Sequence, residues 1–120
     1  MPNRSFNPGD VMSKYFVDPK GLKGKEIAPG TEIRVAYGDR IMLSFVDIKA
    51  GGVVPMHSHP HEQGGICLDG AMEFTIGGET RIIRKGEGWM IPGGVPHSVR
   101  ALEAGASALD IFSPHREDYK

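Results

Sequence analysis

Glycine spacing is the feature of this sequence that most restricts its fold. The chain has 17 glycines in 120 residues, roughly twice the usual share, and they recur at short intervals. Glycine destabilises helices, and no segment between the glycines keeps a 3.6-residue apolar period long enough for a helix. We therefore expect short strands joined by turns.

The runs between the glycines have the length and pattern of strands. Residues 71–76 read AMEFTI and alternate apolar with polar side chains, as in a strand with one buried face. Gly77-Gly78 tolerates the positive φ of a tight turn, which predicts a hairpin between residues 71–76 and 79–85. We expect similar turns at Gly38-Asp39 and Asp69-Gly70.

Many short strands at regular spacing favour an all-β sandwich or small barrel, and a jelly roll is the expected form. Residues 1–30 differ, because NPGD, DPKGLKGK and APG are rich in proline, glycine and lysine. We predict that residues 1–30 form an irregular arm of the same domain, with a short strand or helical turn at most. Residues 31–120 are predicted to form the β-barrel domain, which suits a chain of this length.

Charge and composition exclude several classes of protein. The net charge is −1, from 14 basic and 15 acidic residues without a dense basic cluster, which argues against nucleic-acid binding. The apolar runs are too short to span a bilayer, and the amino terminus lacks the pattern of a signal peptide. The one cysteine, Cys67, excludes an internal disulfide and suits a reducing compartment. We expect a cytoplasmic protein with neither nucleic-acid nor membrane partners.

Metal-binding side chains are concentrated in HSHPHEQ, residues 57–63. His57 and His59 are two residues apart, so on a strand both would leave the same face, and His61 and Gln63 share that parity. A further histidine, His97, follows the proline- and glycine-rich IPGGVP. Histidine nitrogens with an oxygen donor suit Fe, Ni, Zn or Mn and not Ca or Mg. An H-x-H pair alone is equally compatible with no metal.

Two stretches of the chain resemble the two signature motifs of the cupin superfamily. They read Gly51-x5-His57-x-His59-x3-Gln63-x6-Gly70 and Gly86-x5-Pro92-x-Gly94-x2-His97-x3-Ala101. The family usually has glutamate where Gln63 stands and asparagine where Ala101 stands. The resemblance implies a six-to-eight-stranded cupin jelly-roll β-barrel with a metal inside, bound by His57, His59, Gln63 and His97.

The glutamine has a consequence for charge. Three neutral imidazoles and a neutral amide leave the full charge of a divalent metal uncompensated, so the site should favour anionic ligands such as a carboxylate. Glu62 has the opposite strand parity and is expected to face outward or to brace a neighbouring strand. His61 is expected to lie at the rim or to orient a ligand.

A narrower resemblance covers residues 35–119. HSHPHEQ, EFTIGGET, IPGGVPHSVRALE and DIFSPHRED together resemble the small pectin-degradation cupins of the KdgF type, which linearise 4,5-unsaturated uronates. The resemblance implies the same four metal ligands and places the remaining active-site residues at Asp110, Phe112 and Arg116. The residues alone leave open that Phe112 belongs to the core and that Asp110 is a turn or ion-pair residue.

Each implied residue suits this chemistry. A Zn, Ni, Fe or Mn ion would hold the substrate carboxylate or ring oxygen. Arg116 offers a planar fork to a carboxylate or hydroxyl. Asp110 would activate water or relay a proton to C4 of the sugar, which is a general acid–base role, and Phe112 would form an apolar wall.

Two other functions remain open. The first is an Fe-dependent dioxygenase acting on a small aromatic or enediol substrate, since three histidines leave open positions on the metal. The second is a non-catalytic barrel that captures a small anion through its metal. Since cupins of this size often form dimers, we also expect a homodimer, and the amino-terminal arm is one segment that could contact the second subunit.

Overall fold

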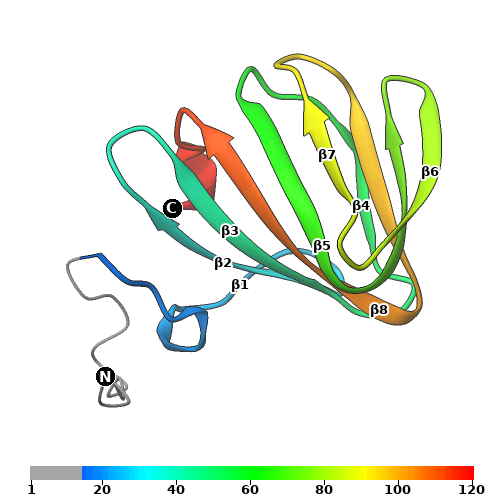
Figure 1. The fold of residues 1–120 in the computed structure, drawn as a ribbon, viewed down its shortest axis with the longest axis horizontal. Coiled ribbons are helices and arrows are strands. Elements are labelled where there is room, and N and C mark those ends of the chain that lie inside the picture. The colour runs from blue at the N-terminus through cyan, green and yellow to red at the C-terminus, as the bar shows by residue number, and fades with distance from the viewer. Residues whose placement is uncertain (1–14) are drawn as a thin grey trace.

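The computed structural model describes residues 15–120, which form eight strands and two short 3-10 turns (Figure 1). In chain order the elements are η1 (Pro19–Gly21), β1 (Lys25–Ala28), β2 (Thr31–Tyr37), β3 (Met42–Ile48), β4 (Val53–His57), β5 (Glu62–Ile76), β6 (Glu79–Arg84), β7 (Gly88–Ile91), β8 (His97–Ser113) and η2 (Glu117–Tyr119). In the described range, no helix has the length and apolar character that a membrane span requires.

All strands belong to one antiparallel sheet. Its hydrogen-bonded path runs β1-β2-β3-β8-β5-β6, while β4 pairs with β8 and β7 with β5. The long strands β5 and β8 pair along most of their length, and their register shifts at Cys67/Asp69 and Gly70/Met72. Figure 1 shows the two strands curving so that the sheet folds over itself. The predicted all-β jelly roll is confirmed.

The sheet is a folded sandwich and not the closed barrel that the resemblance implied. In the described part of the chain, β1 pairs only with β2, and β4 pairs only with β8, so no ladder joins β1 to β4. Because β1 has only four residues, the sheet stays open along this side. The predicted arm ends in this edge strand, and residues 1–14 of it lie outside the described range.

Two of the three predicted turns are present. β5 pairs with β6 from Ala71↔Arg84 to Ile76↔Glu79, and Gly77 and Gly78 have φ values of 56° and 89°. The turn between β2 and β3 is closed by the Gly38 amide, which donates to the Ile41 carbonyl at 3.0 Å.

The turn predicted at Asp69-Gly70 is wrong. β5 continues through it as a bulge, in which Gly70 has a φ of 73°. A Cβ atom on Gly70 would collide with the Gly105 carbonyl oxygen, so β8 passes directly against this backbone. Pairing with β8 on both sides of the bulge keeps the strand intact.

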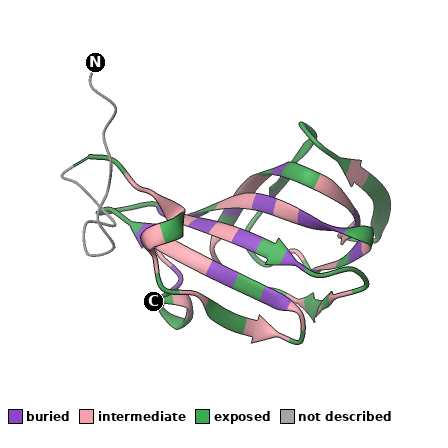
Figure 2. Ribbon diagram, turned by 90° about the horizontal axis from the view of Figure 1, so that it is seen from below, coloured by how far each residue is buried: buried purple, intermediate pink, exposed green. Residues whose placement is uncertain are grey.

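Buried positions alternate with less buried ones along the strands (Figure 2), and most of the buried side chains are apolar. Alternation in β3 buries Met42, Ser44, Val46 and Ile48. The buried polar or charged side chains among the described residues are Thr31, Ser44, His59, Gln63, His97 and Arg116. Four of the six, Ser44, Gln63, His97 and Arg116, line one cavity, and since buried polar groups need partners, this cavity is the candidate site.

Candidate metal centre

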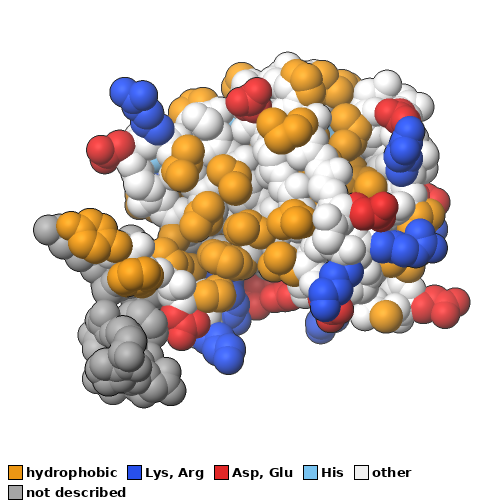
Figure 3. Space-filling view, viewed as in Figure 1, with side chains coloured by type: hydrophobic (Ala, Val, Ile, Leu, Met, Phe, Trp, Pro, Cys, Tyr) orange, Lys and Arg blue, Asp and Glu red, His pale blue; other side chains and the backbone are white. Residues whose placement is uncertain are grey.

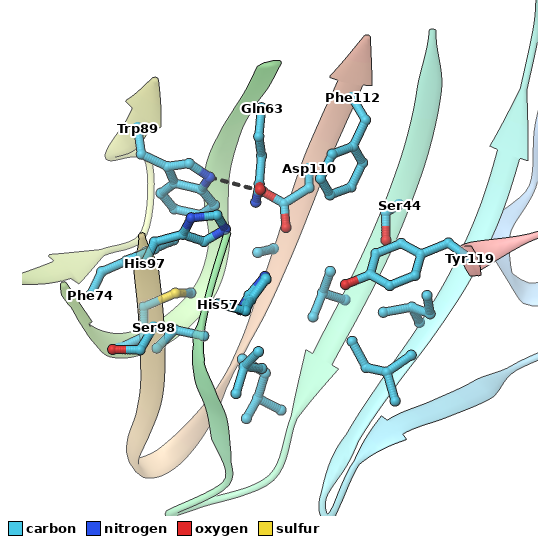
Figure 4. A pocket seen from close by; sticks show the side chains of 18 of the residues that line it. Ser44, His57, Gln63, Phe74, Trp89, His97, Ser98, Asp110, Phe112 and Tyr119 are labelled. Atoms are coloured by element: carbon cyan, nitrogen blue, oxygen red, sulfur yellow. Dashed lines mark hydrogen bonds between the residues drawn. The ribbon is translucent and has the colours of Figure 1, made fainter. Parts of the chain in front are cut away.

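Three histidines meet inside the sandwich. His57 ends β4 and lies opposite His97, the first residue of β8, while His59 follows in the loop after β4. One ring nitrogen from each histidine lies within 4.8 Å of the other two, and the rings of His57 and His97 are 4.4 Å apart between centroids. Figure 4 shows His57 and His97 in the cavity together with Gln63.

Main-chain carbonyl groups orient the three rings. Each Nδ1 atom lies close to a carbonyl oxygen two residues away: His57 to Pro55 at 2.9 Å, His97 to Val95 at 2.9 Å, and His59 to His61 at 3.1 Å. A carbonyl oxygen only accepts, so each neutral ring carries its proton on Nδ1. This leaves the Nε2 lone pair of each ring available to a metal.

The loop that carries His59 is held by the second motif. The Gly94 amide donates to the His59 carbonyl at 2.8 Å, and a Cβ atom on Gly93 would collide with the Pro60 carbonyl oxygen. The shared strand face expected for the H-x-H pair is therefore wrong, because β4 ends at His57 and the chain turns away before Pro60. Contacts with Gly93 and Gly94, and not strand parity, position His59.

Gln63 joins the histidine cluster from β5. Its Oε1 atom lies 3.0 Å from His59 Nε2, and its Nε2 atom donates to Asp110 Oδ1 at 2.9 Å. With the His59 proton on Nδ1, two lone-pair atoms face each other, an arrangement that a bound cation would relieve. Within the described range, the buried Nε2 of His97 also lacks a partner. Three imidazole nitrogens and an amide oxygen fit a first-row divalent metal.

Burial tunes the protonation of the centre. It lowers the pKa of His59 from 6.5 to about 4, with the charge of Arg116 acting in the same direction, and it also lowers the pKa of His97. Both rings are therefore neutral near pH 7, the form that binds a metal. Burial raises the pKa of Asp110 from 3.8 to about 6, although the hydrogen bonds from Gln63 and Trp89 act to lower it.

The structure brings Phe112 and Arg116 to the same cavity as Asp110. Phe112 is 2% exposed, and its ring meets that of His59 edge to face at 5.6 Å. The Arg116 side chain is buried, and its Nη2 bonds Asp118 at 2.9 Å. Its Nε and Nη1 atoms are buried without a partner among residues 15–120. The cavity thus contains a cation with free donors.

The cavity residues that the sequence did not single out include Ser44, Trp89 and Tyr119. The indole of Trp89 donates to Asp110 Oδ1 at 2.8 Å, and the guanidinium of Arg116 lies 3.9 Å from the Tyr119 ring centre. Strand alternation in GWMI places Trp89 and Ile91 on one face, a signal that identifies Trp89 as inward-facing. Tyr119 stands in a charged tail without periodicity, so the sequence carries no such signal for it.

The other two members of HSHPHEQ lie at the edge of the site. Glu62 is exposed, and His61 is half-buried with its ring 5.3 Å from that of His59. His61 also supplies the carbonyl oxygen that orients the His59 ring.

The cavity continues into a groove on the open side of the sheet. Both the cavity and the groove are lined by Ile27, Val54, His57, Arg116 and Tyr119. Since His57 lines both, the groove leads a small molecule to the histidine cluster from this side.

Comparison with known proteins agrees with this architecture. Residues 44–112 match the model of the Cupin domain family. The pectin degradation protein KdgF of Dickeya dadantii (strain 3937) is 31% identical over 110 residues, which cover 90% of this chain and 99% of that protein. The solved structure of KdgF from Halomonas sp. has a TM-score of 0.81 and 28% identity, and covers 91% of this chain and 100% of that one.

A more distant relative has a different activity. Quercetin 2,3-dioxygenase of Bacillus subtilis (strain 168) is 32% identical over 80 residues, which span 66% of this chain but only 24% of that protein. The matched family and the near full-length similarity to KdgF show that this chain belongs to the cupin family and is a KdgF-like member of it.

Proposed function

We propose that this chain is a metal-dependent enzyme that linearises 4,5-unsaturated uronates. The similarity to KdgF supports a role in pectin degradation. The observation that carries the proposal is the position of Arg116 beside the histidine cluster: it is a buried cation whose Nε and Nη1 find no acceptor in the described part of the chain. The substrate class has a carboxylate that would pair with this cation.

Arg116 is the recognition group for the substrate carboxylate. A guanidinium withdrawn from water destabilises the protein unless its N–H groups find acceptors. The Asp118 carboxylate pairs with Nη2 and is largely exposed, while Nε and Nη1 find no acceptor among residues 15–120 and are left for a ligand. The ring of Tyr119 holds the guanidinium by a cation–π contact, so its orientation is set before a substrate arrives.

The metal would be bound by His57, His59, Gln63 and His97. Zn, Ni, Fe and Mn all accept such a donor set. A divalent ion there would act as a Lewis acid that stabilises negative charge on a substrate oxygen.

Asp110 is proposed to move the proton. Linearisation breaks the bond between C1 and the ring oxygen. The C1 hydroxyl loses a proton and becomes an aldehyde, a proton is added at C4, and C5 becomes a ketone. Asp110 would accept the first proton and return it to C4, so no atom is gained or lost. One oxygen of Asp110 is held by Gln63 and Trp89, and the other points into the cavity (Figure 4). Phe112 would form the apolar wall beside the sugar.

The test is turnover without oxygen. Metal-loaded protein is incubated anaerobically with 4,5-unsaturated galacturonate, and loss of the absorbance of the conjugated double bond is followed together with the NMR spectrum of the product. We expect the 5-keto product, and Arg116→Gln should raise KM about 10-fold or more, with partial recovery in Arg116→Lys. Thermal stabilisation by the uronate without product would reject this reaction and favour the non-catalytic binding barrel.

A second candidate is an Fe-dependent dioxygenase. The partial similarity to quercetin 2,3-dioxygenase and the three-histidine cluster favour it. It predicts oxygen consumption with an aromatic or enediol substrate by the iron-loaded protein. Anaerobic turnover of the uronate by zinc- or nickel-loaded protein would exclude it.

We also propose a homodimer formed through the outer face of the sheet. Hydrophobic side chains gather over β3, β8 and β5 on the face in Figure 3. Strand register places them side by side, and together they form the outer apolar face: Leu43, Phe45, Ile66, Leu68, Met90, Leu109 and Ile111. Ile66, Leu68, Met90 and Ile111 are each at least 39% exposed.

The size and shape of the outer apolar face favour a second copy of the chain as its partner. Four strands about 4.8 Å apart and about five residues long cover roughly 300 Å², the size at which an apolar patch marks an interaction site. Two such sheet faces stack as in a β-sandwich, about 10 Å apart. A standard interface buries about 800 Å² per partner, so the face would form its centre within a polar rim.

A further inference from the structure

We propose that Trp89 is a positioning residue which, through Asp110, determines which end of the Gln63 side-chain amide faces the three histidines. The inference rests on the metal site of the proposed function, but not on the identity of the substrate.

Trp89, Gly65 and Asp110 lie side by side on three neighbouring strands. Gly65 of β5 pairs with Trp89 of β7 on one side and with Asp110 of β8 on the other. The indole Nε1 reaches across the glycine to Asp110 Oδ1 at 2.8 Å, the bond drawn in Figure 4. A Cβ atom on Gly65 would lie 2.6 Å from this oxygen and would also meet the indole nitrogen. The absence of a side chain at position 65 is thus what permits the bond.

The direction of this hydrogen bond determines the next one. An indole N–H only donates, so the Asp110 oxygen it contacts is an acceptor. Gln63 approaches the same oxygen at 2.9 Å and must therefore present its NH2 group. Because the amide is planar, its oxygen then points the other way, to 3.0 Å from His59 Nε2. The reversed amide would set two oxygens against each other and turn an N–H group, which has no lone pair, toward the metal position.

The orientation set by these two hydrogen bonds matters because the proposed metal ligand is an amide. A glutamate, the usual residue of the family motif, offers an oxygen at both ends of its carboxylate and can bind a metal in either orientation. A glutamine has one ligating end, so the site needs a second group that distinguishes oxygen from nitrogen. Trp89 and Asp110 make that distinction, and the buried position of the indole, which lies beside the Phe74 ring at 4.9 Å, shields their hydrogen bond from water.

The decisive experiment measures metal affinity and not turnover. The dissociation constants of Zn²⁺ and Co²⁺ are measured by competition with a chromogenic chelator for wild type, Trp89→Phe and Phe74→Leu. Trp89→Phe removes only the donor and keeps an aromatic ring, and we expect affinity to fall about 10- to 100-fold, with a changed visible spectrum of bound Co²⁺. Phe74→Leu disturbs the same packing without touching the hydrogen bonds, so its affinity should stay within about twofold of wild type. Wild-type affinity in Trp89→Phe would overturn the inference.

A measurement on the wild-type protein covers the case in which Trp89→Phe does not fold. Trp89 is the only tryptophan of the chain, so the indole N–H gives a single resonance in a ¹⁵N spectrum. We expect slow exchange of this proton with solvent and a shift of the resonance when Zn²⁺ is added, although the indole is not a ligand. Exchange at the rate of an unfolded chain, or no response to Zn²⁺, would overturn the inference. If the uronate is not turned over while these results hold, the proposed substrate fails and the role of Trp89 stands.

Discussion

Gln63 donates a hydrogen bond of 2.9 Å to Asp110, from one strand of the central β5–β8 pair to the other. The bond links the side chain proposed to bind the metal with the side chain proposed to move the proton. Their two roles can be separated experimentally, because an acceptor oxygen is sufficient for positioning, whereas proton transfer requires a carboxyl group.

Asp110→Asn should separate the two roles. The asparagine oxygen can still accept from Trp89 and Gln63, so the affinity for Zn²⁺ should stay near that of wild type. Because the amide cannot exchange a proton with the substrate, kcat at saturating metal should fall about 10²- to 10⁴-fold. Initial rates on unsaturated galacturonate measure kcat, and competition with a chelator measures the affinity for Zn²⁺. Undiminished turnover would remove Asp110 from the proposed mechanism.

Gly65→Ala should be more harmful than Gly64→Ala. The added methyl group at position 65 would enter the space of the Trp89–Asp110 bond, so we expect a loss of about 1–3 kcal/mol in the free energy of unfolding and weaker metal binding. At position 64 the nearest atom, at 3.0 Å, is the sulfur of the exposed, flexible Met90 side chain. Urea unfolding of both variants tests the difference, and equal stability losses would contradict it.

Gly93→Ala should displace the loop that carries His59. A Cβ atom at position 93 would collide with the Pro60 carbonyl, and the adjacent bond from Gly94 to His59 would be strained. We expect Zn²⁺ affinity to fall about 10-fold or more. Gly38→Ala is the matched control, because nothing lies within 4 Å of a Cβ there and its φ is not positive. An unchanged affinity in Gly93→Ala would show that this contact does not position the histidine.

The buried thiol of Cys67 predicts a pH dependence of stability. Burial raises the pKa of Cys67 above 9.0, so above pH 9 the unfolded chain loses this proton more readily than the folded one. The folded state then binds more protons, and the free energy of unfolding should decrease as pH rises past 9. Urea unfolding at pH 8 and pH 10 should show a smaller decrease in Cys67→Ala than in wild type. Equal decreases would mean that the thiol does not contribute.

Ile111→Lys should disrupt the proposed dimer. A charge at the centre of the outer apolar face would have to be buried against the same face of the second copy. Light scattering coupled to size exclusion should then give the mass of a monomer. Ile82 of β6 is similarly exposed but lies outside this face, so Ile82→Lys should leave the dimer intact. A monomeric wild type would reject the dimer, and a dimeric Ile111→Lys variant would place its interface elsewhere.

Local chemistry made much of the fold predictable. The alternation in residues 71–76 and the two glycines after it depend only on neighbouring residues, and the hairpin they predict is present. The same local logic failed at Asp69-Gly70, where a turn dipeptide lies in a continuous strand because β8 pairs with it on both sides. Pairing with a distant strand outweighed the local preference.

The candidate site likewise has one part that the sequence predicts and one part that depends on the tertiary structure. Motif spacing pointed to His57, His59, Gln63 and His97, and the structure brings these side chains together. The order of residues along the chain contained nothing about the bond between Trp89 and Asp110, which are 21 positions apart and meet across the bare backbone of Gly65. Side-chain types and short-range spacing are properties of the chain. The contacts that orient Gln63 and bury Arg116 beside the histidines exist only once strands distant in sequence are aligned in register.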